Sequence, residues 1–375
     1  MKVNLFFDPS VSGHILEYIH HVYSFTNMSH DKFIFVVGLD FNDRKSLFEW
    51  EQRDNVEFVF LTTDETKKYY SKNLFLSAYY KTILIRKYAL AYNADNIFLN
   101  YFIDALPFLP FFLPRRMNLS GIVYRIFLYK KDKGIKRFCE KILYGLITKL
   151  SAIKRIYLLN DNNATALFNE MFNTDKFYYL PDPTPTVDMS KLVNLRQEYD
   201  IAVSDVVYFQ FGIDTRKHSL DILNAIDLLT EEETRGRVFV FARYVDKRIE
   251  ETFRQKVKQM GSRHRIIVID KYLSYQELYN WVYTCDVIFA TYSNVCQSSG
   301  TIGYGACFHK PIIGAKDGLL GFLIRENKLG ITVFPKPKDI RDAILCDIVP
   351  ITNNYAETHS IENFAQTIIH GLKVK

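Results

Sequence analysis

The segment Thr291–Gly330 reads TYSNVCQSSGTIGYGACFHKPIIGAKDGLLGFLIRENKLG. It follows an apolar run, Val287–Ala290, and breaks into the small residues Ser298-Ser299-Gly300-Thr301 where a helix is expected to begin. A second apolar run and a glycine turn, Asp317-Gly318, come after that helix. The unpaired N–H groups and the dipole at such a helix start favour a bound diphosphate. The same pattern also fits an ordinary strand–helix–strand unit that binds no ligand.

Short apolar runs alternate with longer helical patterns along the whole chain, which predicts a parallel α/β architecture. Candidate strands in the first half are residues 3–7, 32–37, 56–61, 96–99, 121–127, 155–159 and 176–179, and those in the second half are 206–211, 237–242, 266–269, 287–290 and 311–313. Between the halves, the run Leu180–Pro185 holds three prolines, which exclude both helix and ladder pairing.

We therefore expect two doubly wound, Rossmann-like α/β domains that face a cleft. The first domain is predicted over residues 1–182 and the second over residues 183–358. An amphipathic helix in the remaining segment, residues 359–375, is predicted to pack back onto the first domain.

The bulk composition bounds the class of protein. At 375 residues with 48% hydrophobic residues, the chain is long enough to bury two cores. Its five cysteines stand at no metal-ligand or redox spacing, which indicates reduced thiols in a cytoplasmic protein. No uncharged apolar run reaches the roughly 18 residues that a spanning helix needs, and Val3–Phe7 is predicted as a strand rather than a signal peptide.

Positive charge gathers in one part of the sequence. Between Lys81 and Arg155 there are 15 Lys and Arg residues against 4 Asp and Glu residues, although the whole chain carries only +6. The region also holds the aromatic run Leu106–Pro114, followed by Arg115 and Arg116. This combination suits contact with an anionic membrane surface. The alternative is a buried apolar run beside a solvated charged face, and no motif for nucleic acid accompanies the charge.

Three stretches of the second half resemble a known family. They are YFQFGIDTRK (Tyr208–Lys217), the segment Lys271–Phe289, and Thr291–Gly330. Together they resemble the GT-B glycosyltransferases, and in particular the retaining glycosyltransferase family 4 (group 1), over about residues 205–335. In the first half the likeness is one of outline only, with the turn Ser12-Gly13-His14 standing where that family has a glycine-rich acceptor loop.

The chain departs from that family at two acidic positions. Its members usually carry two glutamates with seven residues between them around the donor helix, and the matching positions here are Cys296 and Tyr304. The resemblance thus implies the fold and a nucleotide-sugar site, and it leaves the catalytic residues open. A catalytically silent GT-B protein that binds a nucleotide sugar or a partner transferase is the alternative.

A departing diphosphate needs positive charge and N–H or O–H donors around it. Gly212 would allow a close backbone approach, and Arg216 and Lys217 place two cations just before a predicted helix, where the dipole opposes them unless an anion binds. Arg243, at the end of the next strand, would reach the same phosphates. The alternative for all three cations is a solvated strand or helix end.

The predicted helix start offers further donors. The hydroxyls of Ser298, Ser299 and Thr301 would bind the diphosphate, and Gly300 would let its oxygens approach. Simple capping of the helix is the alternative for these residues. Tyr272 would face the nucleotide base and Tyr304 the ribose, unless both rings are buried.

Acid–base chemistry would come from the first domain. His14 and Asp8 both follow the first strand, at the edge where doubly wound sheets place their ligands. His14 has the better intrinsic pKa for proton transfer, although a histidine at a helix start is often structural. No cluster of His, Cys, Asp or Glu suggests a metal, so no cofactor is expected beyond the sugar nucleotide itself.

From the resemblance we expect a metal-independent transferase with a nucleotide-diphosphate sugar as donor and a lipid-linked glycan as acceptor. Its context would be the synthesis of a surface polysaccharide such as capsule or O-antigen. The protein would be peripheral on the cytoplasmic face of the cell membrane.

Overall fold

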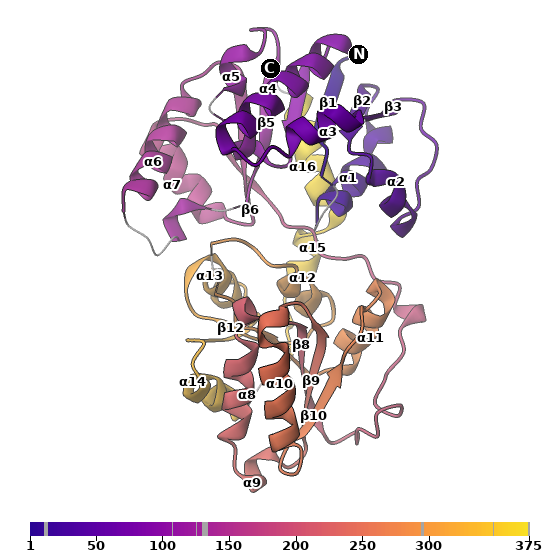
Figure 1. Cartoon of the computed structure of the whole chain (residues 1–375), viewed down its shortest axis with the longest axis vertical. Helices are drawn as coiled ribbons and strands as arrows, with labels where there is room; N and C mark the ends of the chain where they lie inside the picture. Colours follow the sequence, from indigo (N-terminus) through magenta and orange to yellow (C-terminus); the bar gives the residue numbers. More distant parts are fainter. Residues whose placement is uncertain are drawn as a thin grey trace. The chain divides into compact units, whose positions relative to one another are not determined.

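The computed structural model contains two compact α/β units (Figure 1). The first comprises Met1–Pro181 together with Ile361–Lys375, and the second comprises Asp182–Ser360. The structure describes residues 1–10, 14–106, 108–124, 126–129, 134–293, 296–347 and 349–373.

The first unit is built on a seven-stranded sheet in the order β3-β2-β1-β4-β5-β6-β7, with every neighbouring pair parallel. Its strands are β1 (Val3–Asp8), β2 (Lys32–Val37), β3 (Val56–Phe60), β4 (Asn96–Leu99), β5 (Asn118–Val123), β6 (Ile153–Leu159) and β7 (Phe177–Leu180). Most positions of the central strands are apolar because both faces of the sheet are covered. The strand order reverses between β1 and β4. The carboxyl ends of these two strands therefore form the switch point, where ligands bind in doubly wound sheets.

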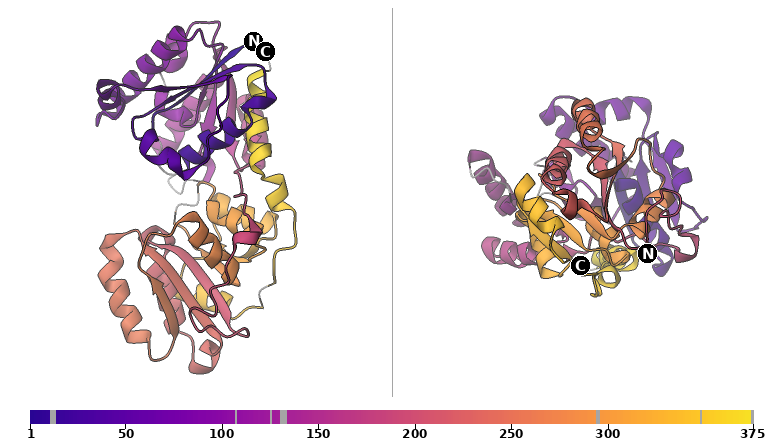
Figure 2. Two further views of the ribbon diagram at one scale, coloured as in Figure 1. Left: turned by 90° about the vertical axis from the view of Figure 1, so that its right-hand side faces the viewer. Right: turned by 90° about the horizontal axis from the view of Figure 1, so that it is seen from below.

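Helices cover both faces of this sheet. They are α1 (Ile15–Ser24), α2 (Phe41–Arg44), α3 (Thr63–Tyr69), α4 (Leu74–Ala91), α5 (Leu109–Phe112), α6 (Ile135–Thr148), α7 (Asn162–Phe172) and α16 (Ile361–Lys373). The last helix, α16, packs on α1, with the rings of Tyr18 and Phe364 centred 4.8 Å apart. It runs alongside the sheet and ends beside the amino terminus, where Lys2 Nζ donates a 3.2 Å hydrogen bond to the carbonyl of Lys373 (Figure 2).

The second unit repeats the plan with a six-stranded parallel sheet in the order β10-β9-β8-β11-β12-β13. Its strands are β8 (Val206–Ile213), β9 (Arg237–Tyr244), β10 (Arg265–Ile269), β11 (Val287–Ala290), β12 (Ile312–Ala315) and β13 (Gly330–Val333). Its helices are α8 (Ser219–Asp227), α9 (Glu231–Thr234), α10 (Lys247–Met260), α11 (Tyr275–Thr284), α12 (Gly300–Cys307), α13 (Gly318–Glu326), α14 (Pro337–Ile344) and α15 (Tyr355–Thr358). Here the switch point lies between β8 and β11.

The two parallel sheets confirm the predicted fold class of two doubly wound domains. One strand was not predicted, the edge strand β13, which begins at Gly330 and pairs with β12. Gly330 has φ +142°, and a Cβ there would lie 2.2 Å from the carbonyl oxygen of Ile312. The close pairing of β13 with β12 therefore needs a glycine at this position. In the sequence, a four-residue strand that begins with glycine looks like a loop.

Candidate functional site

The candidate donor site lies at the switch point of the second sheet, where β8 and β11 end. Gly212 near the end of β8 has φ +84°, and a Cβ there would stand 2.8 Å from Lys217 Nζ. Lys217 Nζ donates a hydrogen bond to the carbonyl of Phe211. The glycine thus makes room for the lysine side chain to fold back over the strand end.

Lys217 meets the start of α12 through a residue that the sequence analysis did not single out, Tyr292. The Lys217 ammonium lies 5.3 Å from the centroid of the Tyr292 ring, and the Tyr292 hydroxyl shares a 2.6 Å hydrogen bond with Thr301 Oγ1. The Lys217 ammonium and the Thr301 hydroxyl therefore both contact the Tyr292 side chain. We call Lys217, Tyr292, Ser299 and Thr301 the switch-point cluster.

The electrostatics of Tyr292 show the effect of this arrangement. Burial alone would raise the pKa of its hydroxyl, but the neighbouring Lys217 charge and the hydrogen bonds of Ser299, Thr301 and Lys217 outweigh burial and lower it. The cluster thus favours negative charge on an oxygen at this position. The same property would favour an anionic ligand there.

Several hydrogen bonds fix the loop after β8 to the loop after β11. Thr291 Oγ1 donates to the carbonyl of Lys217 at 2.9 Å, and the amide of Ser293 donates to the carbonyl of Arg216 at 2.7 Å. His218, at φ +53°, contacts Asp221 at 2.7 Å through Nδ1 and Ser293 Oγ at 2.9 Å through Nε2. Sequence reasoning missed His218 and Ser293, because a contact across 75 residues leaves no local pattern.

Arg216 and Lys217, the two neighbouring cations of the loop after β8, differ in their surroundings. Arg216 donates through Nε and Nη2 to Asp214 Oδ2, at 3.1 and 2.7 Å, and this pairing raises its pKa. The Asp214 carboxylate therefore compensates much of the Arg216 charge. Of the two predicted cations, the structure brings Lys217 into the switch-point cluster.

Arg243 and Tyr272 come together at the ends of β9 and β10. The guanidinium of Arg243 lies 4.6 Å from the centroid of the Tyr272 ring, which is 67% exposed. Arg243 has φ +60°, a backbone conformation that costs a non-glycine residue energy. The pair offers a cation and an exposed aromatic face side by side.

One of the predicted residues caps the start of α12. Ser299 caps the helix, since its Oγ accepts a 3.3 Å hydrogen bond from the amide of Thr301, and Gly300 is the first helical residue. Ser298 precedes this cap. Tyr304, one turn further along, packs against Tyr279 with the ring centroids 6.1 Å apart, beside a buried cluster of the second unit.

The two predicted acid–base residues of the first unit occupy different environments. Asp8 is buried at the end of β1, whereas the His14 side chain is 58% exposed and contacts Glu17 at 2.9 Å. The neighbouring residues Ser12 and Gly13 of the predicted acceptor turn lie outside the described residues. Of the two candidates, Asp8 is therefore the one that the surrounding protein encloses.

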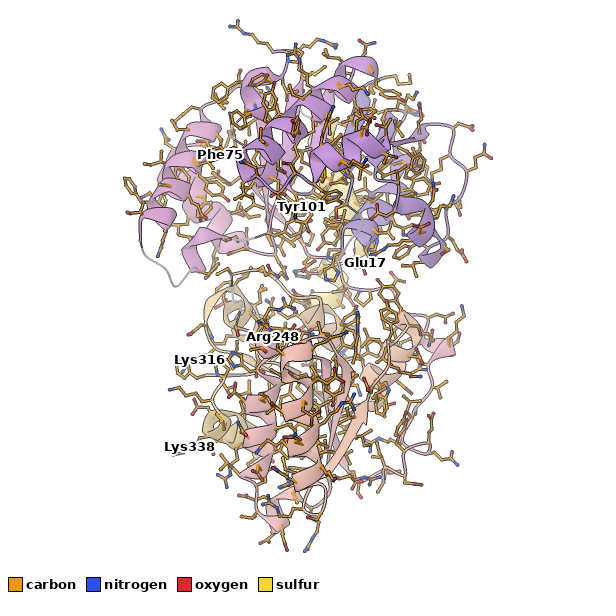
Figure 3. All side chains as sticks on the ribbon, viewed as in Figure 1. Glu17, Phe75, Tyr101, Arg248, Lys316 and Lys338 are labelled. Carbon is orange, nitrogen blue, oxygen red and sulfur yellow. The ribbon has the colours of Figure 1, made fainter. Side chains whose placement is uncertain are left out.

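The first unit also carries apolar side chains on its surface. On α6 the exposed face consists of Ile135, Phe138, Ile142 and Leu146, with spacings of three and four residues that place them along one side. The run Leu106–Pro114 divides: Leu109 is buried and Phe111 is 71% exposed. Phe75 on the first turn of α4 is a further exposed ring (Figure 3).

Two features are absent from the described ranges. None of the helices there is long and apolar enough to cross a bilayer. In the same ranges, no three His, Cys, Asp or Glu side chains are grouped so that they could hold a metal ion.

Neither a protein-family model nor a curated protein sequence matches the chain. Solved structures match its fold. Anabaena HepE, solved in complex with UDP and glucose, is 14% identical over 99% of both chains, with a TM-score of 0.67. A glycosyltransferase from Rickettsia africae is 14% identical over 99% of this chain and 93% of its own, with a TM-score of 0.63. WaaG, a glycosyltransferase involved in lipopolysaccharide biosynthesis, is 12% identical over 97% and 95%, with a TM-score of 0.58. The chain therefore has the two-domain α/β fold of the GT-B glycosyltransferases.

Proposed function

We propose that this protein is a metal-independent glycosyltransferase that moves a sugar from a nucleoside-diphosphate donor to a lipid-linked glycan. The observation that carries the proposal is the switch-point cluster, in which Lys217, Tyr292 and Thr301 meet where β8 and β11 end. A ligand of a doubly wound sheet binds at this edge. A cation, hydroxyl groups and a helix start together provide the donors that a diphosphate requires.

In this proposal the cluster stabilises the leaving group. The Lys217 ammonium faces the diphosphate, and the hydroxyls of Ser299 and Thr301 donate to its oxygens. The Arg243–Tyr272 pair supplies a cation and an aromatic face for the phosphates and the base. Because HepE was solved with UDP and with UDP-glucose, uridine nucleotides are the first donors to test.

The acceptor side of the proposal places the protein on the cytoplasmic face of a membrane, in surface polysaccharide synthesis. Its support is the exposed apolar face of α6, within a helix that also carries Arg137 and the exposed Lys141. A helix with an apolar face and basic flanks lies in the interface of an anionic bilayer. A lipid-linked acceptor would then diffuse in the same surface.

The test measures UDP release from a panel of UDP-glucose, UDP-galactose and UDP-N-acetylglucosamine, with octyl β-D-glucoside as a glycan with an alkyl tail. We expect turnover of at least one donor, and calorimetry should show UDP binding. Folded protein that binds none of the nucleotides contradicts the proposal. Binding without turnover would instead favour a silent nucleotide-sugar-binding protein, the alternative that the residues Cys296 and Tyr304 suggest.

A further inference from the structure

Helix α4 carries apolar side chains on its outer side as well as on its inner side. The inner side, which includes Ile85 and Ala89, is buried in the first unit. The outer side presents four apolar residues that are between 37% and 47% exposed, namely Leu76, Tyr79, Ile83 and Leu90. Their spacings of three, four and seven residues place them in one stripe along the helix. Because a surface helix normally turns polar groups to water, and α4 contains no Asp or Glu, this stripe has the character of a helix–helix contact.

The short helix α5 widens this apolar surface. The Tyr79 ring lies 6.3 Å from the Phe108 ring and 6.4 Å from the Phe112 ring, centroid to centroid, and Phe75 is exposed one turn before Tyr79 (Figure 3). We call the exposed residues Phe75, Leu76, Tyr79, Ile83, Leu90, Phe111 and Phe112 the α4 face. Together they expose on the order of 700 Å², more than the roughly 300–600 Å² of the largest patch on a typical monomer. This area is close to the ~800 Å² that each partner buries in a standard interface.

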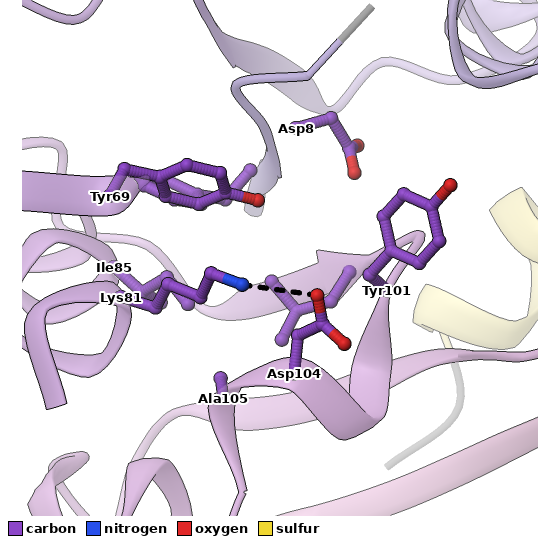
Figure 4. Close-up of a pocket in the computed structure, with 9 residues that line it drawn as sticks. Asp8, Tyr69, Lys81, Ile85, Tyr101, Asp104 and Ala105 are labelled. Carbon is purple, nitrogen blue, oxygen red and sulfur yellow. Dashed lines mark hydrogen bonds and ion pairs between the residues drawn. The ribbon is translucent and has the colours of Figure 1, made fainter. Parts of the chain in front are cut away.

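The two lysines of α4 are paired within the first unit. Lys81 Nζ contacts Asp104 Oδ2 at 3.0 Å on the inner side of the helix (Figure 4), and Lys87 Nζ contacts Glu65 Oε1 at 2.6 Å. Arg86 is exposed and forms no ion pair in the described part of the chain. Since carboxylates compensate both lysines, α4 itself offers little free positive charge to an anionic lipid surface. Arg86 instead suits the face of an aromatic ring on an apolar partner.

The order of residues on the outer side of α4 is chemically similar in both directions from Ile83. The pairs at equal distances from Ile83 are Leu76 with Leu90, Tyr79 with Lys87, and Tyr80 with Arg86. If a second α4 lies antiparallel with its Ile83 against the first, each pair meets twice, as a twofold axis requires. Aliphatic residues then meet aliphatic residues, and cations meet aromatic rings. The α4 face is therefore complementary to a second copy of itself.

We propose that the α4 face is the contact surface of a homodimer, in which the α4 helices of two chains pack antiparallel around a twofold axis at Ile83. The rings of α5 flank this contact and extend it to the size of a standard interface. The surface belongs to the first unit alone, so the inference goes beyond the proposed function and does not depend on it.

Analytical ultracentrifugation of the full chain tests this pairing. We expect a reversible dimer at about 50 µM, because interfaces of this size give micromolar or tighter binding. Ile83→Glu places two like charges opposite each other on the axis, and it should raise the dissociation constant at least about 100-fold. The matched control is Leu167→Glu on α7, which makes the same kind of change at a 42% exposed site of the same unit. This control should leave the dimer intact.

Oxidative cross-linking tests the antiparallel register. An equimolar mixture of Leu76→Cys and Leu90→Cys should give a disulfide-linked dimer, because these positions meet across the axis. Leu76→Cys alone should not, since its two copies would lie about 21 Å apart along the helices. Ile83→Cys, on the axis, should cross-link by itself. Wild type oxidised in parallel measures any bond that forms through the exposed Cys139 and Cys346.

Three results would overturn the inference. The first is a wild type that stays monomeric at about 100 µM, and the second is an Ile83→Glu variant that dimerises as tightly as Leu167→Glu. The third is Leu76→Cys that cross-links alone as well as in the mixture. A monomeric wild type that binds phosphatidylglycerol vesicles, and loses this binding in Ile83→Glu, would assign the face to lipid, with Arg115 and Arg116 after α5 as the charge. None of these results decides whether the protein binds UDP, so the proposed function is tested separately.

Discussion

The Lys217 ammonium lies 5.3 Å from the centroid of the Tyr292 ring, and this contact connects the loops that follow β8 and β11. Both loops lie at the switch point of the second sheet. A cation held over a phenol, with its charge not taken up by a carboxylate in the described contacts, remains available to an anion. Lys217 should therefore contribute most to binding a diphosphate.

Replacing this cation should weaken nucleotide binding. Lys217→Met keeps the length of the side chain and removes the charge, and we expect the Kd for UDP to rise about tenfold or more, because hydrogen bonds to charged groups contribute about 1.5–3 kcal/mol. Calorimetry measures the change. The control is Lys256→Met, which removes a cation paired with Asp227 at 3.0 Å near the end of α8. Equal effects of the two substitutions would mean that Lys217 acts only through net charge.

Arg243 allows binding to be separated from backbone strain. Its φ of +60° favours glycine, so Arg243→Gly should leave the melting temperature unchanged or slightly higher. The same variant loses the cation over Tyr272, and its affinity for UDP should fall several-fold. Asn173→Gly, at φ +45° in the first unit, is the matched control and should leave UDP binding unchanged. A variant that loses stability and affinity together would show that Arg243 has a structural role.

The fold could be predicted from local patterns, since each buried parallel strand is a short apolar run between helical patterns. Of the thirteen strands among the described residues, twelve were predicted, and β13 was not, because its pairing depends on how closely Gly330 approaches Ile312. The site could be predicted only as residue types at strand ends. Which of Arg216 and Lys217 faces the cluster depends on the bond to Asp214, and the pKa of Asp8 depends on burial and on Asn100, 92 residues away.

The packing of α16 on the first sheet depends on a glycine. A Cβ at Gly371 would lie 1.9 Å from the hydroxyl oxygen of Tyr157, whose side chain is fully buried and donates to the carbonyl of Thr367 at 3.2 Å. Gly371→Ala should therefore destabilise the protein by about 1–3 kcal/mol, the usual cost of overpacking. Gly145→Ala on α6 is the control: its Cβ would meet Phe172 at 3.5 Å, an ordinary contact, and stability should stay equal or rise. Urea unfolding measures the free energy of unfolding of both variants. If Gly371→Ala is as stable as Gly145→Ala, then α16 shifts to make room for the added methyl group.

Low pH should destabilise the first unit through His21 on α1, the helix on which α16 packs. Burial lowers the pKa of His21 to about 4, against the opposing charge of Glu17, and its Nδ1 is buried without a hydrogen-bond partner among the described residues. Because the unfolded chain binds this proton first, stability falls as the pH drops from about 6.5 to about 4, by roughly 3 kcal/mol. His21→Phe should remove this loss, as shown by melting temperatures across that range. His30→Gln, at an exposed site, should leave the acid sensitivity of the wild type in place.

Membrane contact should depend on the apolar face of α6. Phe138 and Ile142 are 64% and 46% exposed on the same side of the helix, and each would contribute about 1–2 kcal/mol if it entered the acyl boundary. Phe138→Glu combined with Ile142→Glu should lower partitioning into phosphatidylglycerol-containing vesicles at least tenfold. Added salt should weaken wild-type binding, since the basic residues act through screened charge.

A matched substitution gives this last experiment its control. Leu228 is 52% exposed at the end of α8 in the second unit, and Leu228→Glu makes the same chemical change away from the proposed surface. Cosedimentation of all three proteins with neutral and anionic vesicles measures the difference. If the α6 double variant binds anionic vesicles as well as Leu228→Glu does, then α6 is not the surface that meets the lipid. If neutral vesicles bind the wild type equally well, the basic residues contribute nothing and the charge excess has another role.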